Sequence, residues 1–122
     1  MVIKITRGLP YANQWRLPNG KDMWPNLADF EVRSQLRKTK LASSQLITNL
    51  HLFMTKSYGI DTQANDIIVR WRMTGAETRA LAGDGFFDVI LSDPGVTDER
   101  GLRIYSDQIK LASLITAPEG LL

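Results

Sequence analysis

The stretch from residue 67 to residue 91 constrains the fold more than any other part of the chain, because it holds two apolar runs separated by a polar connector. In the first run, apolar residues take every second position and arginines stand between them: Ile67, Val69, Trp71 and Met73, with Arg70 and Arg72. The second run repeats the alternation with Phe87, Val89 and Leu91. Successive side chains of a strand point to opposite faces, so this period of two predicts strands with one buried face. We therefore predict two neighbouring antiparallel strands, joined by a short connector, with a sheet built outward from them.

The connector, residues 74–81, predicts one helical turn. Thr74 is a suitable N-cap, and Glu77 follows three residues later, which is the spacing of a capping box. Gly83 and Gly85 then end the turn and lead into the second strand.

Further segments with alternating character are predicted to be strands: 2–6, 29–37, 43–54 and 102–116. The residues assigned to the buried faces of the second and third of these are Phe30, Val32, Ser34, Leu36, Leu46, Leu50, Leu52 and Met54. The last strand is predicted to carry a bulge at residues 106–107, because its alternation resumes out of step after them.

Residues 7–27 hold three of the five prolines. Proline donates no ladder hydrogen bond, so this segment predicts irregular chain or short edge strands, with residues 14–17 as one such piece. The whole chain then has about seven or eight short strands and no sustained helical period, which favours a β-sandwich or a small barrel. Of these two we predict the antiparallel β-sandwich, with one short helical turn. We predict an all-β fold with a single domain over residues 1–116 and a C-terminal tail over residues 117–122.

Composition excludes several classes of protein. Cysteine is absent, so disulfide scaffolds, thiolate metal sites and cysteine nucleophiles are ruled out. The net charge of +2 is far from the dense positive charge of a dedicated nucleic-acid binder. No apolar run approaches the roughly 18 residues of a membrane span, and the N-terminus lacks the order of a signal peptide. We expect synthesis in the cytosol without export by the general secretory route.

Catalytic and metal-binding patterns are weak. His51 is the only histidine, and its place among apolar strand residues favours a half-exposed strand position over a general base. The acidic residues Asp84, Asp88, Asp93, Asp98 and Glu99 do not have the spacing of a calcium loop, and solvated hairpin ends explain them better. No glycine-rich nucleotide-binding loop is present. We expect no enzyme activity, no metal and no cofactor.

Two basic clusters leave alternatives open. Trp71 between Arg70 and Arg72 could form a stacking platform for single-stranded nucleic acid, but its alternation with apolar neighbours favours a place in the core. The second cluster is either a solvated face or an electrostatic rim for a partner; it consists of Arg33, Arg37, Lys38 and Lys40.

The remaining candidates for partner contact are apolar. Trp15 and Trp24, in the proline-rich segment, either plug an open end of the sandwich or anchor a protein partner; sugar stacking is a third possibility without supporting polar residues. Leu121 and Leu122 end the tail and are either disordered or docked on a neighbouring subunit. The predicted partner-contact residues are Trp15, Trp24, Arg37, Lys38, Lys40, Leu121 and Leu122.

The order of features resembles that of a known group of proteins. A short first strand precedes Trp24-Pro25 and the strand at 29–37, and Thr78-Arg79-Ala80-Leu81 separates the 67–73 strand from Gly85-Phe86-Phe87-Asp88-Val89-Ile90-Leu91-Ser92-Asp93. This series is similar to the small β-sandwich proteins of tailed bacteriophages, found in baseplates, at fibre or receptor-binding-protein attachment domains and as other virion accessories. Those proteins often have a glycine at the start of the closing strand, where this chain has Ser106-Asp107-Gln108.

The resemblance implies a structural role in an assembled particle, with no active site to carry over. We expect a virion protein of the tail or baseplate, made in the host cytoplasm, that holds neighbouring virion proteins together or attaches a fibre. Multiple copies or a homo-oligomer are expected, and no membrane. A capsid decoration protein is the nearest alternative. The alternative of another class is a small nucleic-acid-binding barrel, for which Trp71 would have to be exposed.

Overall fold

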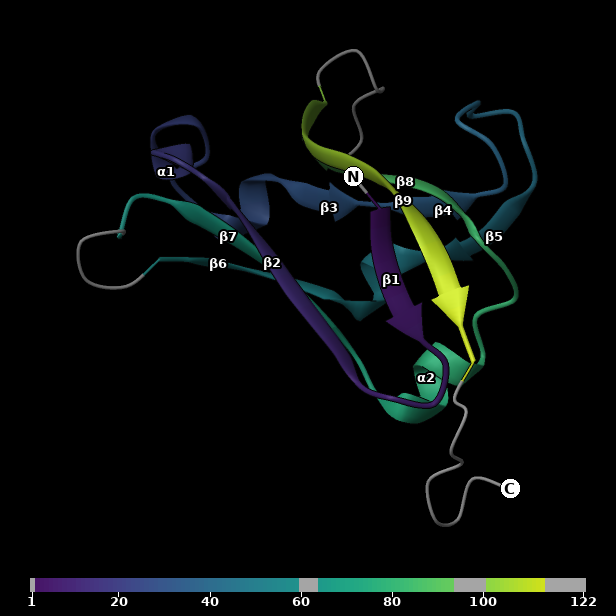
Figure 1. Cartoon of the computed structure of the whole chain (residues 1–122). Coiled ribbons are helices and arrows are strands. Elements are labelled where there is room, and N and C mark those ends of the chain that lie inside the picture. The colour runs from purple at the N-terminus through teal and green to yellow at the C-terminus, as the bar shows by residue number, and fades with distance from the viewer. Residues whose placement is uncertain (1, 60–63, 94–100, 114–122) are drawn as a thin grey trace.

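In the computed structural model, which describes residues 2–59, 64–93 and 101–113, the chain forms two β-sheets packed against each other (Figure 1). The large sheet consists of β1 (Val2–Thr6), β3 (Glu31–Arg33), β4 (Gln35–Arg37), β5 (Leu46–Asn49), β8 (Gly85–Ser92) and β9 (Leu102–Ala112). The small sheet consists of β2 (Tyr11–Leu17), β6 (Met54–Tyr58) and β7 (Ile67–Met73). The short helices are α1 (Gly20–Met23), η1 (Leu27–Asp29), η2 (Leu50–Phe53) and α2 (Gly75–Arg79).

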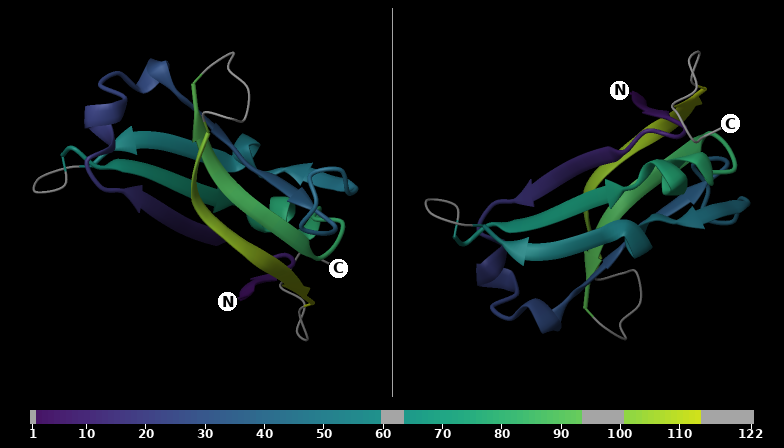
Figure 2. Two further views of the ribbon diagram at one scale, coloured as in Figure 1. Left: turned by 90° about the horizontal axis from the view of Figure 1, so that it is seen from above. Right: turned by 90° about the horizontal axis from the view of Figure 1, so that it is seen from below.

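The predicted all-β, sandwich-like fold is confirmed, and the described strands do not close into a barrel. The large sheet has the order β1-β9-β8-β4-β5, with β3 also paired to β8, and the small sheet has the order β2-β7-β6. The strands of the two layers run obliquely to each other (Figure 2). All pairings are antiparallel except that of β1 with β9, which is parallel and was not predicted.

The core lies between β7 and β8. The predicted inward faces are confirmed: Ile67, Val69, Trp71, Met73, Phe87, Val89 and Leu91 are all buried. The prediction that these two strands pair with each other was wrong, because β7 belongs to the small sheet and β8 to the large one. A strand with one apolar face buries that face by packing against a second sheet, which pairing within its own sheet would not achieve. The helix α2 carries the chain from one layer to the other (Figure 1).

The prediction of one long strand over residues 43–54 was also wrong. The chain forms β5, turns through η2 and enters the other sheet as β6. Leu50 is fully buried in that turn, but the exposed fraction of Leu52 is 72%. Because the helical turn breaks the period of two, positions before and after it no longer share a face.

The proline-rich segment contains more regular structure than the predicted piece at residues 14–17. Strand β2 spans seven residues between Pro10 and Pro18 and forms an edge of the small sheet. The predicted strand at 29–37 divides into β3 and β4 at Ser34, and its inward residues Phe30 and Leu36 are buried as expected. The bulge in β9 lies at Ile104, which the pairing with β8 skips, two residues before the predicted position.

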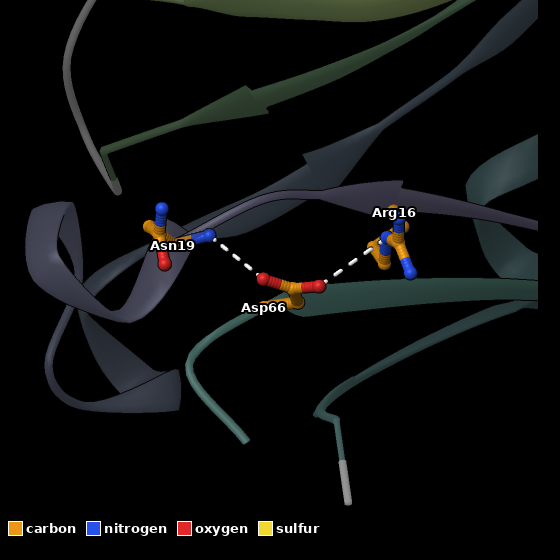
Figure 3. Close-up of polar contacts among 3 residues, drawn as sticks. All are labelled: Arg16, Asn19 and Asp66. Atoms are coloured by element: carbon orange, nitrogen blue, oxygen red, sulfur yellow. Dashed lines mark hydrogen bonds and ion pairs between the residues drawn. The ribbon is translucent and has the colours of Figure 1, made fainter. Parts of the chain in front are cut away.

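Asp66, just before β7, contacts the end of β2 and the turn that follows it (Figure 3). Its carboxylate accepts the backbone N–H of Asn19 at 2.8 Å and lies 3.2 Å from Nε of Arg16. Asn19 has the left-handed φ of 55°, and a Cβ on the following Gly20 would lie 2.7 Å from Ile67. The turn therefore needs a residue that tolerates positive φ followed by glycine.

The turn between β1 and β2 is held by α2. The predicted capping box is confirmed, since the Thr74 side chain accepts from Glu77 N–H and the Glu77 side chain accepts from Thr74 N–H. Thr78 is fully buried, and its Oγ1 accepts from Gly8 N–H at 3.1 Å and lies 2.8 Å from the carbonyl oxygen of Leu9. This hydroxyl therefore satisfies backbone groups of a turn 70 residues away in sequence.

We predict that Thr78→Val lowers the free energy of unfolding by about 2 kcal/mol, because it leaves buried backbone groups without partners. Urea denaturation measures the change. Thr78→Ser, which keeps the hydroxyl and loses a methyl group, is the matched control and should cost about 1 kcal/mol. A valine variant at least as stable as the serine variant would contradict this role.

Candidate functional site

A groove of about 900 Å³ lies on the outer face of the large sheet. Its floor comes from β8, whose inward side chains fill the core. The alternate residues Phe86, Asp88 and Ile90 therefore point out of the sandwich and line the groove. Strands β3, β4 and β9 flank this floor, and the β4–β5 loop contributes a wall.

The start of β8 approaches β4 very closely at the groove. A Cβ on Gly85 would lie 2.4 Å from the carbonyl oxygen of Arg37, so only glycine fits there without a shift of the backbone. This contact brings Phe86, opposite Arg37 in the strand register, next to the loop that follows β4. The Nζ atom of Lys40 in that loop lies 5.4 Å from the centroid of the Phe86 ring.

The loop wall is held in place by hydrogen bonds around Ser44. The Ser44 hydroxyl lies 2.7 Å from the carbonyl oxygen of Leu41 and 3.2 Å from that of Thr39. Arg37 donates from Nη1 to the Ser44 carbonyl oxygen at 2.7 Å and from Nη2 to Oε1 of Gln35 at 2.8 Å. The wall is therefore formed before any partner arrives.

Cationic side chains line the groove on several sides. Arg33, Arg37, Lys40 and Arg103 come from β3, β4, the β4–β5 loop and β9. The Nε atom of Arg103 lies 3.9 Å from Oδ2 of Asp88, and 66% of the arginine side chain remains exposed. Such an exposed, long ion pair contributes little to stability, so its guanidinium can turn toward another carboxylate.

Ser34 explains the break between β3 and β4 and the position of the only histidine. Ser34 is buried, and its hydroxyl donates to the carbonyl oxygen of Asp88 at 2.6 Å. The Nδ1 atom of His51 lies 3.0 Å from the Ser34 carbonyl oxygen, and His51 lines the groove. His51 is half-buried, as predicted, although it belongs to η2 and not to a strand.

The predicted partner-contact residues occupy different places. Arg37 and Lys40 line the groove, and Lys38 is exposed beside them. The guanidinium of Arg37 already donates hydrogen bonds to Ser44 in the loop wall and to Gln35. Leu121 and Leu122 lie outside the described residues. Contact of these residues with a partner stays a prediction.

The two remaining candidates are tryptophans outside the groove. Trp24 is 6% exposed and donates from Nε1 to Asp93 at 2.7 Å, so most of its surface is already covered by this chain. Trp15 is half-buried, with its ring 6.0 Å from that of Trp71 and 5.0 Å from that of Tyr105. Trp71 itself is fully buried, which leaves no stacking platform between Arg70 and Arg72.

The sequence analysis did not connect the groove residues Phe86, Asp88, Ile90 and Arg103 with partner binding. A signal for the first was present. Phe86 and Ile90 are apolar residues at positions of β8 that face away from the core. Apolar side chains on an outward face indicate a covered or binding surface. Arg103 carried no such signal, because its position beside Asp88 depends on the pairing of β9 with β8.

A second polar arrangement lies where β2 and β9 meet, and it uses the same short motif twice. In Tyr11-Ala12-Asn13-Gln14, Asn13 donates to the Tyr11 hydroxyl at 3.1 Å and accepts the Gln14 N–H at 2.8 Å. In Tyr105-Ser106-Asp107-Gln108, the Tyr105 hydroxyl donates to Asp107 at 2.6 Å and Gln108 N–H donates to Asp107 at 2.7 Å. A side chain thus caps a backbone amide in each strand.

The Tyr105–Asp107 hydrogen bond shifts both groups. This bond, together with desolvation and the Asp107 charge, raises the pKa of Tyr105 to about 12. Burial would raise the pKa of Asp107, but the hydrogen bonds from Tyr105 and from the Gln108 amide outweigh it, so that its pKa is lowered.

Within the described residues, no group of three or more His, Asp or Glu side chains lies close enough together to hold a metal ion. No helix in the same part of the chain is long and apolar enough to cross a membrane. No known protein-family model matches the sequence, and no curated protein matches it at a significant level.

We predict a loss of stability at high pH that depends on Tyr105. Its pKa in the folded state lies above the ordinary value of 10, so the folded protein holds this proton more tightly than the unfolded chain does. The resulting stabilisation is complete below pH 10 and is lost as the pH rises from about 10 to about 12. Urea denaturation at pH 9 and pH 11 measures the decline, which Tyr105→Phe should reduce.

Asp107→Asn supplies the matched test of the cause. It removes the charge while keeping the shape, so the Tyr105 hydroxyl should titrate closer to pH 10, as followed by tyrosinate absorbance. The lowered pKa of Asp107 also predicts that wild-type stability falls as the pH drops through the acid range, and that this loss is smaller in the variant. An unchanged tyrosine titration in Asp107→Asn would contradict the assignment.

Proposed function

We propose that this chain is a structural, partner-binding protein, and that it serves in the virion of a tailed bacteriophage, in the tail or baseplate or at the attachment of a fibre or receptor-binding protein. The observation that carries the proposal is the groove on the large sheet, where apolar and charged side chains gather on the outer face of a sandwich-like fold. Such a face suits contact with another protein.

The exposed apolar residues near the groove support the same function. Leu41, in the loop wall, is 67% exposed, and Val2, at the other side, is 39% exposed. Apolar groups at a rim lose contact with water when a partner covers them, and this contributes to binding. On a symmetric particle, repeated copies would add weak contacts into a stable joint.

The phage assignment itself is supported by the resemblance in the order of sequence features, from Trp24-Pro25 to the run that begins at Gly85. The same fold and groove would also serve a capsid decoration protein, so the position in the particle is the part that experiment must separate. The nucleic-acid-binding barrel is less well supported, because the tryptophan that it needs on the surface is buried.

Fractionation of particles tests this function. Virions from a lysate of the producing cells are banded in a density gradient and analysed by quantitative mass spectrometry. We expect the chain in the particle band, in a copy number that follows the particle's symmetry, and in the tail fraction after heads and tails are separated. A soluble host protein of similar size is the control for carry-over.

Recovery in the head fraction alone would contradict the tail assignment and favour the decoration protein. Recovery only among free proteins, with none in the particle band, would contradict the virion assignment as a whole.

A further inference from the structure

We propose that the groove on the large sheet binds an extended segment of a partner protein whose groove-facing side chains, at every second residue, include both apolar and acidic ones. This inference rests on the proposed partner-binding function and names the chemistry of the partner. It combines two properties of the groove, its apolar floor and the cations around that floor.

The floor accounts for the apolar part of the segment. Phe86 and Ile90 are half-buried, stand two positions either side of Asp88 on β8, and expose apolar surface to the groove. Side chains two residues apart on an extended partner lie on one face of it, at the same spacing as those on β8. A partner whose apolar and acidic residues both fall at every second position can therefore direct the apolar ones at Phe86 and Ile90 and the acidic ones at the cations beside them.

The surrounding cations account for the acidic part. Lys40 reaches over Phe86 from the loop, and Arg103 lies on β9 with its guanidinium mostly exposed. Arg103 already lies near one carboxylate, that of Asp88, at a distance too long for a strong ion pair. A partner carboxylate placed between these cations would form charge-assisted hydrogen bonds that Asp88 does not supply.

The charges in the groove favour a protein segment over a nucleic acid. Four cations, Arg33, Arg37, Lys40 and Arg103, are accompanied by two carboxylates, Glu31 and Asp88. A nucleic acid carries a negative charge at every phosphate, and the carboxylates would repel it. A polypeptide offers N–H donors to these carboxylates and can carry its own acidic groups only where the cations are.

The wall makes binding less costly. The loop is already fixed by Ser44 and Arg37, so a partner would not need to order it. Binding sites that are formed in advance lose less conformational entropy on association.

Fluorescence anisotropy tests the proposal. The probe is a fluorescein-labelled peptide of roughly ten residues, in which Leu and Glu take every second position in turn and serine stands between them, long enough to follow a strand of this sheet. We expect saturable binding to the full chain that weakens as salt is added. The double variant Lys40→Glu with Arg103→Glu should weaken binding at least about tenfold, since like charges then meet the peptide.

Arg72→Asp and Arg72→Glu are the matched controls. Arg72 is exposed on the outer face of β7, in the small sheet, so these changes reverse a charge away from the groove. Binding should stay within about twofold of wild type, a difference of less than 0.5 kcal/mol by the usual conversion. Thermal unfolding of every variant shows whether the fold is kept.

Three results would overturn the inference. The acidic peptide fails to bind, or the Arg72 controls weaken it as much as the groove variants do, or a labelled oligothymidylate binds more tightly than the peptide and loses affinity in the groove variants. The last result would assign the groove to nucleic acid.

These failures are distinguishable from a failure of the proposed function. If the chain is found in the particle band but does not bind the peptide, the structural role stands and the proposed acidic and apolar partner segment is contradicted. If the chain binds the peptide through the groove but is absent from particles, the assignment of the groove stands and the proposed role in the virion is contradicted.

Discussion

The contact between the apolar faces of β7 and β8 is the interaction on which the rest of the structure depends. Trp71 and Phe87 meet at its centre, with ring centroids 5.5 Å apart, and both are buried. Each strand belongs to a different sheet, so this contact is what holds the two layers together. Removing such large aromatic surfaces from water supplies much of the free energy that opposes the entropy of the unfolded chain.

The same alternation that builds the core also builds the groove. Because Phe87, Val89 and Leu91 point inward, Phe86, Asp88 and Ile90 must point outward on the same strand. The outward positions would be fully solvated on a flat sheet. Here the β4–β5 loop extends beyond the strands that it joins (Figure 1). Residues of this loop form one wall of the groove.

Strands β2 and β9 carry the same local arrangement, one in each sheet. Asn13 on β2 and Asp107 on β9 each accept the next residue's backbone N–H, and each is bonded to a tyrosine two residues earlier. On β2, an edge of the small sheet, an amide that is already bonded is not available to pair with a foreign strand.

The sequence by itself determined which residues of β7 and β8 face the core, where α2 begins and that the chain is built from strands, because period and capping are local properties. It did not determine that β7 and β8 lie in different sheets, that η2 switches the chain between layers, or that β1 pairs in parallel with β9. Arg37 and Lys40 could be selected from charge alone, whereas Arg103 and Asp88 could not be brought together without the register of β8 and β9. Pairing partners are chosen by long-range packing and register, and these exist only once distant segments have met.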